Sequence, residues 1–142
     1  MYEGYLRKPH YYETDQMAIV HHSNYIRWFE EARVDLLEAI QLPYQKIEAA
    51  GIIIPVLDVS CQYKRMVRYG DTLRIQVFID HYTGTRFQFR YEIYNTATEE
   101  LVTTGTSSHC FLSQERQRLI SLKKNFPVFH QLFEDYYKRT LK

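Results

Sequence analysis

Residues 23–40 read SNYIRWFEEARVDLLEAI, with apolar residues at the spacing of an amphipathic helix. The apolar positions are Tyr25, Ile26, Phe29, Ala32, Leu36, Leu37 and Ile40. Ser23 or Asn24 is a natural N-cap, and Pro43 ends the helix or begins a second short one over Tyr44–Ala50. The spacing therefore predicts one long helix, whose apolar stripe needs a surface to pack against.

The segments around this helix predict that surface. Leu73–Asp80 and Phe87–Tyr94 alternate apolar and polar residues with the period of two that is typical of strands. The expected strands are Leu6–Glu13, Ile52–Tyr63, Leu73–Asp80, Phe87–Tyr94 and Glu100–Leu112, and a last helix is expected over Pro127–Arg139. We expect an α+β fold in which a curved antiparallel sheet, a meander after the helix, wraps around the long helix. Its exposed edge invites pairing with a second copy of the chain.

Length and composition indicate one globular domain, residues 1–142. Hydrophobic residues make up 45% of the chain and charged residues 25%, which is near the globular average. The two cysteines, Cys61 and Cys110, form no CxxC pair and fall in strand-like runs, so we expect buried thiols. Met1–Pro9 lacks an apolar signal core and no run is long enough to span a membrane, so a cytoplasmic location is expected.

The charge balance argues against a nucleic-acid partner. The net charge is +1, from 18 basic and 17 acidic residues, and no basic stripe dominates the sequence. Local basic clusters occur at residues 64–68 (KRMVR) and at Lys123–Lys124. Each cluster is either a solvated face or the contact for a small phosphate-bearing ligand.

Most signatures of hydrolases and cofactor enzymes are absent. The chain has no GxSxG nucleophile elbow, no HExxH zinc helix, no phosphate loop and no dinucleotide-binding glycine pattern. Only His21 and His22 are close in sequence among the histidines, and adjacent positions seldom chelate one metal well. We therefore expect neither a metal site nor a redox cofactor.

Residues 12–25 (YETDQMAIVHHSNY) carry the chemistry that remains. They place a carboxylate, Asp15, on a loop that leads into the start of the long helix. The free N–H groups of a helix start bind anions and developing oxyanions, and a nearby carboxylate can attack a carbonyl or deprotonate water. The two parts together suit acyl transfer. The alternative is that Asp15 is only a turn or capping residue.

This segment, with residues 28–33 (WFEEAR), resembles the 4-hydroxybenzoyl-CoA thioesterase-like branch of the hotdog superfamily, which includes the YbgC-type acyl-CoA thioesterases. The family pattern is roughly D-T-D-x-x-G-x-V-x-H-x-x-Y followed by E-x-A-R. The matching residues are Thr14, Asp15, Val20, His22, Tyr25, Glu30 or Glu31, Ala32 and Arg33. Further matches at Gly51–Ile52, Pro55–Val56, Tyr63 and Tyr69–Asp71 extend the resemblance along the whole chain.

The resemblance implies a hotdog fold, with a five- to six-stranded antiparallel sheet around the helix and an extra C-terminal helix. It implies a homodimer with a continuous sheet, often paired into a homotetramer, and hydrolysis of an acyl-CoA near the dimer interface. Asp15 falls on the catalytic aspartate, as nucleophile or general base. The backbone N–H near His22 falls where the family polarises the thioester carbonyl, and Tyr25 would shape the acyl pocket.

Four further residues complete the expected substrate contacts. Val20 and Ser23 flank the predicted oxyanion site in sequence. Arg65 and Arg68, with Lys64, carry the charge to meet CoA phosphates. Near-neutral net charge favours CoA over an acyl carrier protein as the carrier, and the acyl group, fatty or aromatic, is not fixed.

The sequence also departs from the family pattern. Glu13 replaces the first aspartate, Ala18 replaces a glycine, and Met66 stands where many relatives have proline. If that glycine has a positive φ, Ala18 is strained or the loop differs. Glu30, Glu31 and Arg33 either orient the site or form a solvated helix face.

Three alternatives to an acyl-CoA thioesterase stay open. One is a hotdog dimer that binds acyl-CoA without cleaving it, and another is a hydrolase of acyl carrier protein thioesters. The third is a hydratase or dehydratase on the same fold, but the D-x-N-P-x-H signature of those relatives is missing here.

Overall fold

The long helix is present as α1, Ser23–Ala39, in the computed structural model, which describes residues 2–140. Its buried side chains are Asn24, Tyr25, Trp28, Phe29, Ala32, Arg33, Leu36 and Leu37. Five of the seven predicted stripe residues are among them, but Ile26 was predicted wrongly, since it is 48% exposed. The predicted N-cap is wrong by one residue, because His22 is the N-cap and no side chain caps it. The Asn24 amide points back instead and donates to the carbonyl oxygens of Glu13 and His21, at 2.9 and 3.1 Å.

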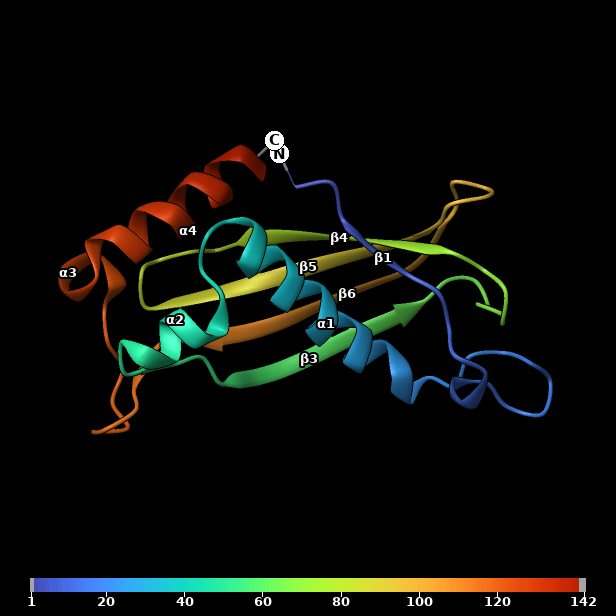
Figure 1. Ribbon diagram of the computed structural model, residues 1–142, viewed down its shortest axis with the longest axis horizontal. Helices are drawn as coiled ribbons and strands as arrows, with labels where there is room; N and C mark the ends of the chain where they lie inside the picture. Colours follow the sequence, from blue (N-terminus) through green and yellow to red (C-terminus); the bar gives the residue numbers. More distant parts are fainter. Residues whose placement is uncertain (1, 141–142) are drawn as a thin grey trace.

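A five-stranded antiparallel sheet covers the apolar stripe of α1. Its strands, in spatial order, are β1 (Tyr5–Arg7), β4 (Leu73–Asp80), β5 (Arg86–Asn95), β6 (Leu101–Cys110) and β3 (Val56–Tyr63). Figure 1 shows α1 lying across one face of this sheet, with β3 along one edge. The predicted α+β class and the predicted packing of sheet and helix are confirmed.

Close packing holds α1 on the sheet. The ring of Phe29 stacks on that of Tyr91 in β5, with centroids 4.2 Å apart and planes 8° from parallel. The same ring lies over Gly105 in β6, where any Cβ would collide with it. Gly105 therefore lets the helix approach the middle of the sheet.

Two features of the sheet differ from the prediction. β3 pairs with β6 and not with β4, so only β4, β5 and β6 form a meander. The alternation of a strand fixes its two faces but says nothing about which strand lies beside it. The predicted first strand, Leu6–Glu13, ends at Arg7, and Tyr11–Glu13 forms a 3₁₀ turn, η1.

The remaining elements lie at one end of the sheet. α2 (Tyr44–Ala49) leads into β2 (Ile52–Ile53), which pairs with β7 (Leu112–Ser113) as a separate two-stranded sheet. Pro55 separates β2 from β3, because proline has no N–H to continue a ladder. A short helix, α3 (Leu122–Asn125), precedes α4 (Pro127–Thr140), whose buried Phe133 and Tyr136 confirm the predicted C-terminal helix.

The structure also bears on the expectations about membrane spans, metal ligands and cysteines. Within residues 2–140, none of the helices combines the length and the apolar character needed to cross a membrane. The same part of the chain holds no group of three or more His, Cys, Asp or Glu side chains arranged to bind a metal ion. Both cysteines are free thiols; Cys110 is buried as expected, whereas Cys61 on β3 is only half-buried.

Candidate active site

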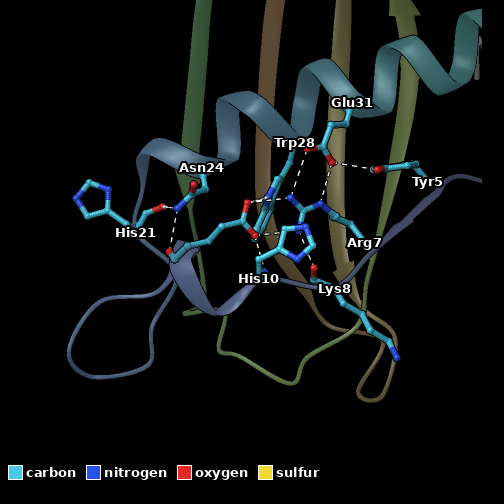
Figure 2. A network of polar contacts seen from close by, with 9 residues as sticks. Tyr5, Arg7, Lys8, His10, His21, Asn24, Trp28 and Glu31 are labelled. Carbon is cyan, nitrogen blue, oxygen red and sulfur yellow. Dashed lines mark hydrogen bonds and ion pairs between the residues drawn. The ribbon is translucent and has the colours of Figure 1, made fainter.

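A buried carboxylate anchors the chain just before the loop that carries Asp15. Glu13 is only 4% exposed and accepts hydrogen bonds from both terminal nitrogens of Arg7, at 2.9 and 2.8 Å. It also accepts from the His10 N–H at 2.7 Å and from the indole N–H of Trp28 at 3.0 Å. Figure 2 shows Arg7 reaching from Trp28 on one side to Glu31 on the other. The network joins β1, η1 and α1.

The electrostatics of this network favour its charged form. Burial alone would raise the pKa of Glu13. The hydrogen bonds from Arg7, and then those from His10 and Trp28, outweigh burial and hold the pKa of this carboxylate below its ordinary value. Glu13, the replacement for the first aspartate of the family pattern, is thus a structural anion whose acceptor sites are already used.

The anchor also fixes both ends of the loop. The carbonyl of Glu13 accepts from the His21 N–H at 2.9 Å and from the Asn24 amide. Thr14 and Val20 then form an isolated antiparallel bridge across the base of the loop. Val20 donates its N–H to the carbonyl of Val67 at 2.8 Å, which docks the loop on the segment after β3.

Asp15 organises the loop between these ends. Its carboxylate Oδ1 accepts the N–H groups of Met17 and Ile19, at 2.8 and 3.2 Å. Ala18, between them, has a φ of 61°, in the left-handed region that favours glycine. The conditional prediction for Ala18 is therefore resolved: the loop keeps the positive φ and a non-glycine residue adopts it. Asp15 itself is exposed, so its carboxylate is open to a ligand.

A cavity of about 400 Å³ lies beside this loop. Its lining consists of Asp15, Ile19, Val20, His21, His22, Tyr25, Tyr63, Lys64, Arg65 and Met66. The structure thus brings five of the predicted site residues to one place, namely Asp15, Val20, His22, Tyr25 and Arg65. Ser23 and Arg68 do not belong to this lining.

The start of α1 supplies a free donor at the cavity. Ser23 donates its N–H to the His21 ring at 3.2 Å, and its hydroxyl lies 2.9 Å from the same ring nitrogen. The His22 N–H has no hydrogen-bond acceptor among the residues that the structure describes. An unpaired N–H at the positive end of a helix is suited to a carbonyl oxygen that gains negative charge.

Two tyrosines form the inner wall. Tyr25 is 3% exposed, and its ring meets that of Tyr63 edge to face at a centroid distance of 4.9 Å. The Tyr63 hydroxyl donates to the carbonyl of His22 at 3.3 Å. Burial raises the pKa of each tyrosine to about 12, so neither hydroxyl acts as a base near neutral pH. Tyr63 was missing from the predicted site residues, although the alternation of β3 puts it on the face shared with Cys61 and Thr103.

The basic residues near the cavity are differently placed. Arg65 lines it but lies 3.4 Å from Glu100, in an exposed ion pair. Lys64, which was predicted with Arg65 and Arg68 as a contact for CoA phosphates, is also in the lining. Arg68 lies outside the lining, and its backbone N–H donates to the Asp71 carboxylate at 2.9 Å, which makes Asp71 a turn residue.

Of the helix residues that were expected either to orient the site or to face solvent, Glu30 is exposed and faces solvent, whereas Glu31 and Arg33 have partners in the fold. Glu31 accepts from Arg7 at 2.8 Å and from the Tyr5 hydroxyl at 3.0 Å, so it extends the Glu13 network. Arg33 is buried and its guanidinium lies 3.5 Å from the hydroxyl of Tyr91. Neither side chain lines the cavity.

Comparison with known proteins also indicates a thioesterase family. A family model described as the Thioesterase-like superfamily matches residues 9–132. The Bacillus subtilis protein YneP, provisionally named an acyl-CoA thioesterase, is 38% identical over 124 residues, which are 87% of this chain and 89% of YneP. The acyl-CoA thioester hydrolase YbgC of Escherichia coli is 29% identical over 88 residues, which are 62% of this chain and 66% of YbgC.

The solved structures agree. A DHNA-CoA thioesterase from Staphylococcus aureus superposes with a TM-score of 0.85 at 31% identity, over 92% of this chain and 87% of that chain. The family resemblance drawn from residues 12–33 and the hotdog fold that it implied are both confirmed. This chain belongs to the thioesterase-like superfamily.

Proposed function

We propose that this protein hydrolyses the thioester bond of an acyl-CoA, giving the free acid and CoA. One observation carries the proposal: Asp15, which is exposed, and His22, whose N–H has no acceptor among the described residues, line the same cavity. The activities named for YneP, YbgC and the Staphylococcus aureus enzyme support it.

The proposed reaction uses the two groups on opposite parts of the thioester carbonyl. The carbonyl oxygen accepts the His22 N–H, which stabilises the negative charge that develops there. A single donor of this kind typically contributes about a hundredfold or more in rate. Asp15 either attacks the carbonyl carbon or takes a proton from a water that attacks it. In both routes the carbon–sulfur bond breaks, CoA leaves as a thiol, and one water is consumed.

The proposed binding mode follows from the lining. The acyl group, fatty or aromatic, lies against the apolar wall formed by Val20 and Tyr25. Lys64 and Arg65 provide positive charge where the carrier leaves the cavity. Ser23 and Arg68 remain in the proposal only as contacts outside the lining, Ser23 through its bonds to His21.

We also propose a homodimer, with dimers pairing into a homotetramer. β3 is an edge strand of the five-stranded sheet, and its Val56, Leu57 and Tyr63 are 45%, 50% and 50% exposed. An edge strand with exposed apolar residues is a template for pairing with a second chain. Pairing along β3 would make one continuous sheet, with the Tyr63 end of the strand, and so the cavity, beside the second subunit.

The test is release of free thiol from a panel of acyl-CoAs. Wild type is compared with Asp15→Asn and with Asp135→Asn, the same change on the exposed face of α4. We expect Asp15→Asn to lower the rate by at least about a hundredfold and Asp135→Asn to keep the wild-type rate. Thermal unfolding measured by circular dichroism should be the same for all three proteins.

Other outcomes choose among the alternatives. Full activity in Asp15→Asn would remove Asp15 from the mechanism. If wild type releases no thiol but binds intact acyl-CoA, the protein is a binding module. If thiol is released only from acyl carrier protein thioesters, the proposed CoA substrate is wrong, but thioester hydrolysis remains the reaction.

A further inference from the structure

A second group of hydrogen-bonded titratable side chains lies where α4 packs beside the turn between β4 and β5. This turn and the loop before α1 are at opposite ends of the molecule (Figure 1). The hydroxyl of Tyr82, in the turn, lies 2.8 Å from Nδ1 of His130. Nε2 of His130 lies 2.7 Å from the carboxylate of Glu134, whose second oxygen lies 2.7 Å from the ammonium of Lys138. We call these four side chains the α4 relay. None of them lines the Asp15 cavity.

The two partners of His130 determine where the proton of its neutral ring lies. A carboxylate only accepts, so Nε2 carries the hydrogen that Glu134 accepts. Nδ1 is then the free acceptor, and the Tyr82 hydroxyl donates to it. The hydrogen bond from Lys138 is the main cause that holds the pKa of Glu134 below its ordinary value, so this carboxylate stays charged. A hydroxyl, an imidazole base and an orienting carboxylate therefore follow one another as in a nucleophile triad.

Packing holds the Tyr82 ring beside its base. It stacks on the rings of His130 and Phe133, with centroid distances of 5.5 and 5.8 Å, and Tyr137 meets it at an angle of 62°. Burial, and then the charge of Glu134, raise the pKa of the Tyr82 phenol above its ordinary value. The hydroxyl therefore keeps its proton near neutral pH. Like the serine of a triad, it needs a base in order to attack an electrophile.

A cavity lies beside the α4 relay and brings a further cation to it. Its volume is about 250 Å³, and its lining includes all four members of the relay together with Lys123 of α3. Leu122 donates its N–H to the carbonyl of Gly84 at 2.9 Å, which ties α3 to the turn that carries Tyr82. Within the described part of the chain, Lys123 has no acidic partner at ion-pair distance. Its charge is free for an anion.

The size and charge of this cavity limit the electrophile that it can take. About 250 Å³ is below the range of sites that hold drug-sized ligands, so the electrophile is small. The ammonium of Lys138 is already held by Glu134, whereas that of Lys123 can meet a phosphate as a point charge. A small acyl donor whose leaving group is phosphate satisfies both conditions.

We propose that Tyr82 accepts the acyl group of a small acyl phosphate, with His130 as its base, Glu134 as a positioning residue and Lys123 as the contact for the phosphate. The phenol oxygen attacks the carbonyl carbon, and its proton passes to Nδ1 of His130. The bond from that carbon to the bridging oxygen then breaks, and the leaving phosphate takes the proton. The products are an O-acyl tyrosine and hydrogen phosphate. This reaction is independent of the proposed thioester hydrolysis.

The first experiment uses acetyl phosphate as the probe. Every protein carries Asp15→Asn, so the thioester site cannot contribute. Mass spectrometry of peptides locates the acetyl groups, and phosphate release gives the rate whether or not water later removes the acetyl group. We expect an acetyl group on Tyr82, and Tyr82→Phe, which keeps the stacked ring, should lower phosphate release to the level of lysine labelling. Acetyl groups on lysines alone, with phosphate release unchanged in Tyr82→Phe, would overturn the proposal.

A pair of histidine variants tests the base. His130→Gln should lower the rate of reaction at Tyr82 by at least about a hundredfold, as expected for loss of a general base. His81→Gln makes the same change at an exposed residue next to Tyr82 and should leave the rate unchanged. Thiol release from acyl-CoA, measured with Asp15 intact, should be the same in both variants, which shows that both are folded. Equal rates at Tyr82 in the two variants would contradict the proposal.

Two further variants separate chemistry from a relay that only fastens α4 to the turn. Glu134→Gln keeps the size of the side chain but removes the charge that selects the tautomer of His130. It should lower the maximal rate at least about tenfold, with the half-saturating concentration of acetyl phosphate unchanged. Lys123→Gln should do the reverse and raise that concentration with the maximal rate retained. If the two variants shift Tm but neither kinetic parameter, the relay is structural and the proposal fails.

Discussion

Glu13 and Asp15 lie two residues apart and both carry a carboxylate, yet their surroundings are opposite. Glu13 is buried and accepts from Arg7, the His10 N–H and Trp28. Asp15 is exposed, and its recorded hydrogen bonds come only from N–H groups of its own loop, those of Met17 and Ile19. One carboxylate is enclosed by donors, and the other keeps part of its surface open at a cavity.

This difference shows how stability and chemistry are divided between neighbouring residues. A carboxylate whose acceptor sites are filled holds parts of the fold together, but it has nothing left for a substrate. A carboxylate bound only by its loop contributes little to folding and can react. The rigid Glu13 network therefore sets the position of the loop, and the loop presents Asp15.

The largest effect on stability is expected for Glu13→Gln. The change removes one of the two carboxylates that pair with buried Arg7. Breaking a buried pair costs about 3–5 kcal/mol, and the remaining bond to Glu31 holds the loss toward the lower end of that range. Asp15→Asn is the matched control, because it is the same chemical change two residues away at an exposed position; its effect should stay within about 0.5 kcal/mol. Urea unfolding followed by circular dichroism measures both free energies.

The comparison would be broken if the two variants lost similar stability, because Asp15 would then be part of the structural network. In an assay of thiol release, the order of the two effects should be reversed. Asp15→Asn should lose turnover while fully folded, whereas Glu13→Gln should retain measurable turnover at temperatures below its unfolding. A folded but inactive Glu13→Gln would mean that this carboxylate acts on the substrate.

The pH dependence of the free energy of unfolding separates the contribution of the buried Glu13 carboxylate from that of a buried histidine. Buried His109, in β6, lies 2.7 Å from the Ser107 hydroxyl, and burial, then the charge of Arg33, lowers its pKa from 6.5 to about 4. Between these two values the unfolded chain binds a proton that the folded chain does not. Stability should therefore fall by up to ~3 kcal/mol as the pH drops from about 6.5 to 4. The lowered pKa of Glu13 adds a further loss only below its ordinary range, near pH 4.5 and lower.

Unfolding free energies of wild type and His109→Gln at several pH values check this. The glutamine amide can keep the bond to Ser107 but does not titrate, so the decline between pH 6.5 and 4 should largely disappear. The decline below pH 4.5 should remain, because Glu13 is intact. An unchanged pH profile in His109→Gln would show that another group is responsible for the upper step.

The elements that the sequence predicted well are those in which local pattern and tertiary packing agree. Helix α1 and strands β4 and β5 have a buried stripe or face that the spacing of apolar residues shows directly. The predicted end of the first strand was wrong because the conformation of residues 8–13 depends on tertiary contacts. Glu13 turns inward to meet Arg7 and Trp28, and no local signal reports that contact. The place of β3 beside β6 is likewise decided by topology, which alternation does not encode.

The candidate site divides in the same way. Asp15, His22 and Tyr25 were predicted because they lie close together in one segment that resembles a known family. Tyr63 was not selected, since it enters the cavity from the end of a strand that is distant in sequence. A residue whose role follows from a long-range contact is visible only once the strand order is known.

The smallest expected effect concerns the loop itself, through Ala18→Gly. Ala18 holds a φ of 61° between the two N–H groups that Asp15 accepts, and its exposed methyl group packs against little. The left-handed conformation costs a non-glycine residue about 1–2 kcal/mol, and the greater freedom of unfolded glycine offsets roughly half of that. We expect a gain of about 0.5–1 kcal/mol, seen as a rise in Tm of a few degrees. Gln16→Gly is the matched control, since Gln16 is exposed in the same loop without a positive φ, and there only the entropy cost remains. If Ala18→Gly instead lowered Tm as Gln16→Gly should, the loop would be held by its contacts with residues 67–69 strongly enough that the backbone conformation of Ala18 carries no measurable strain.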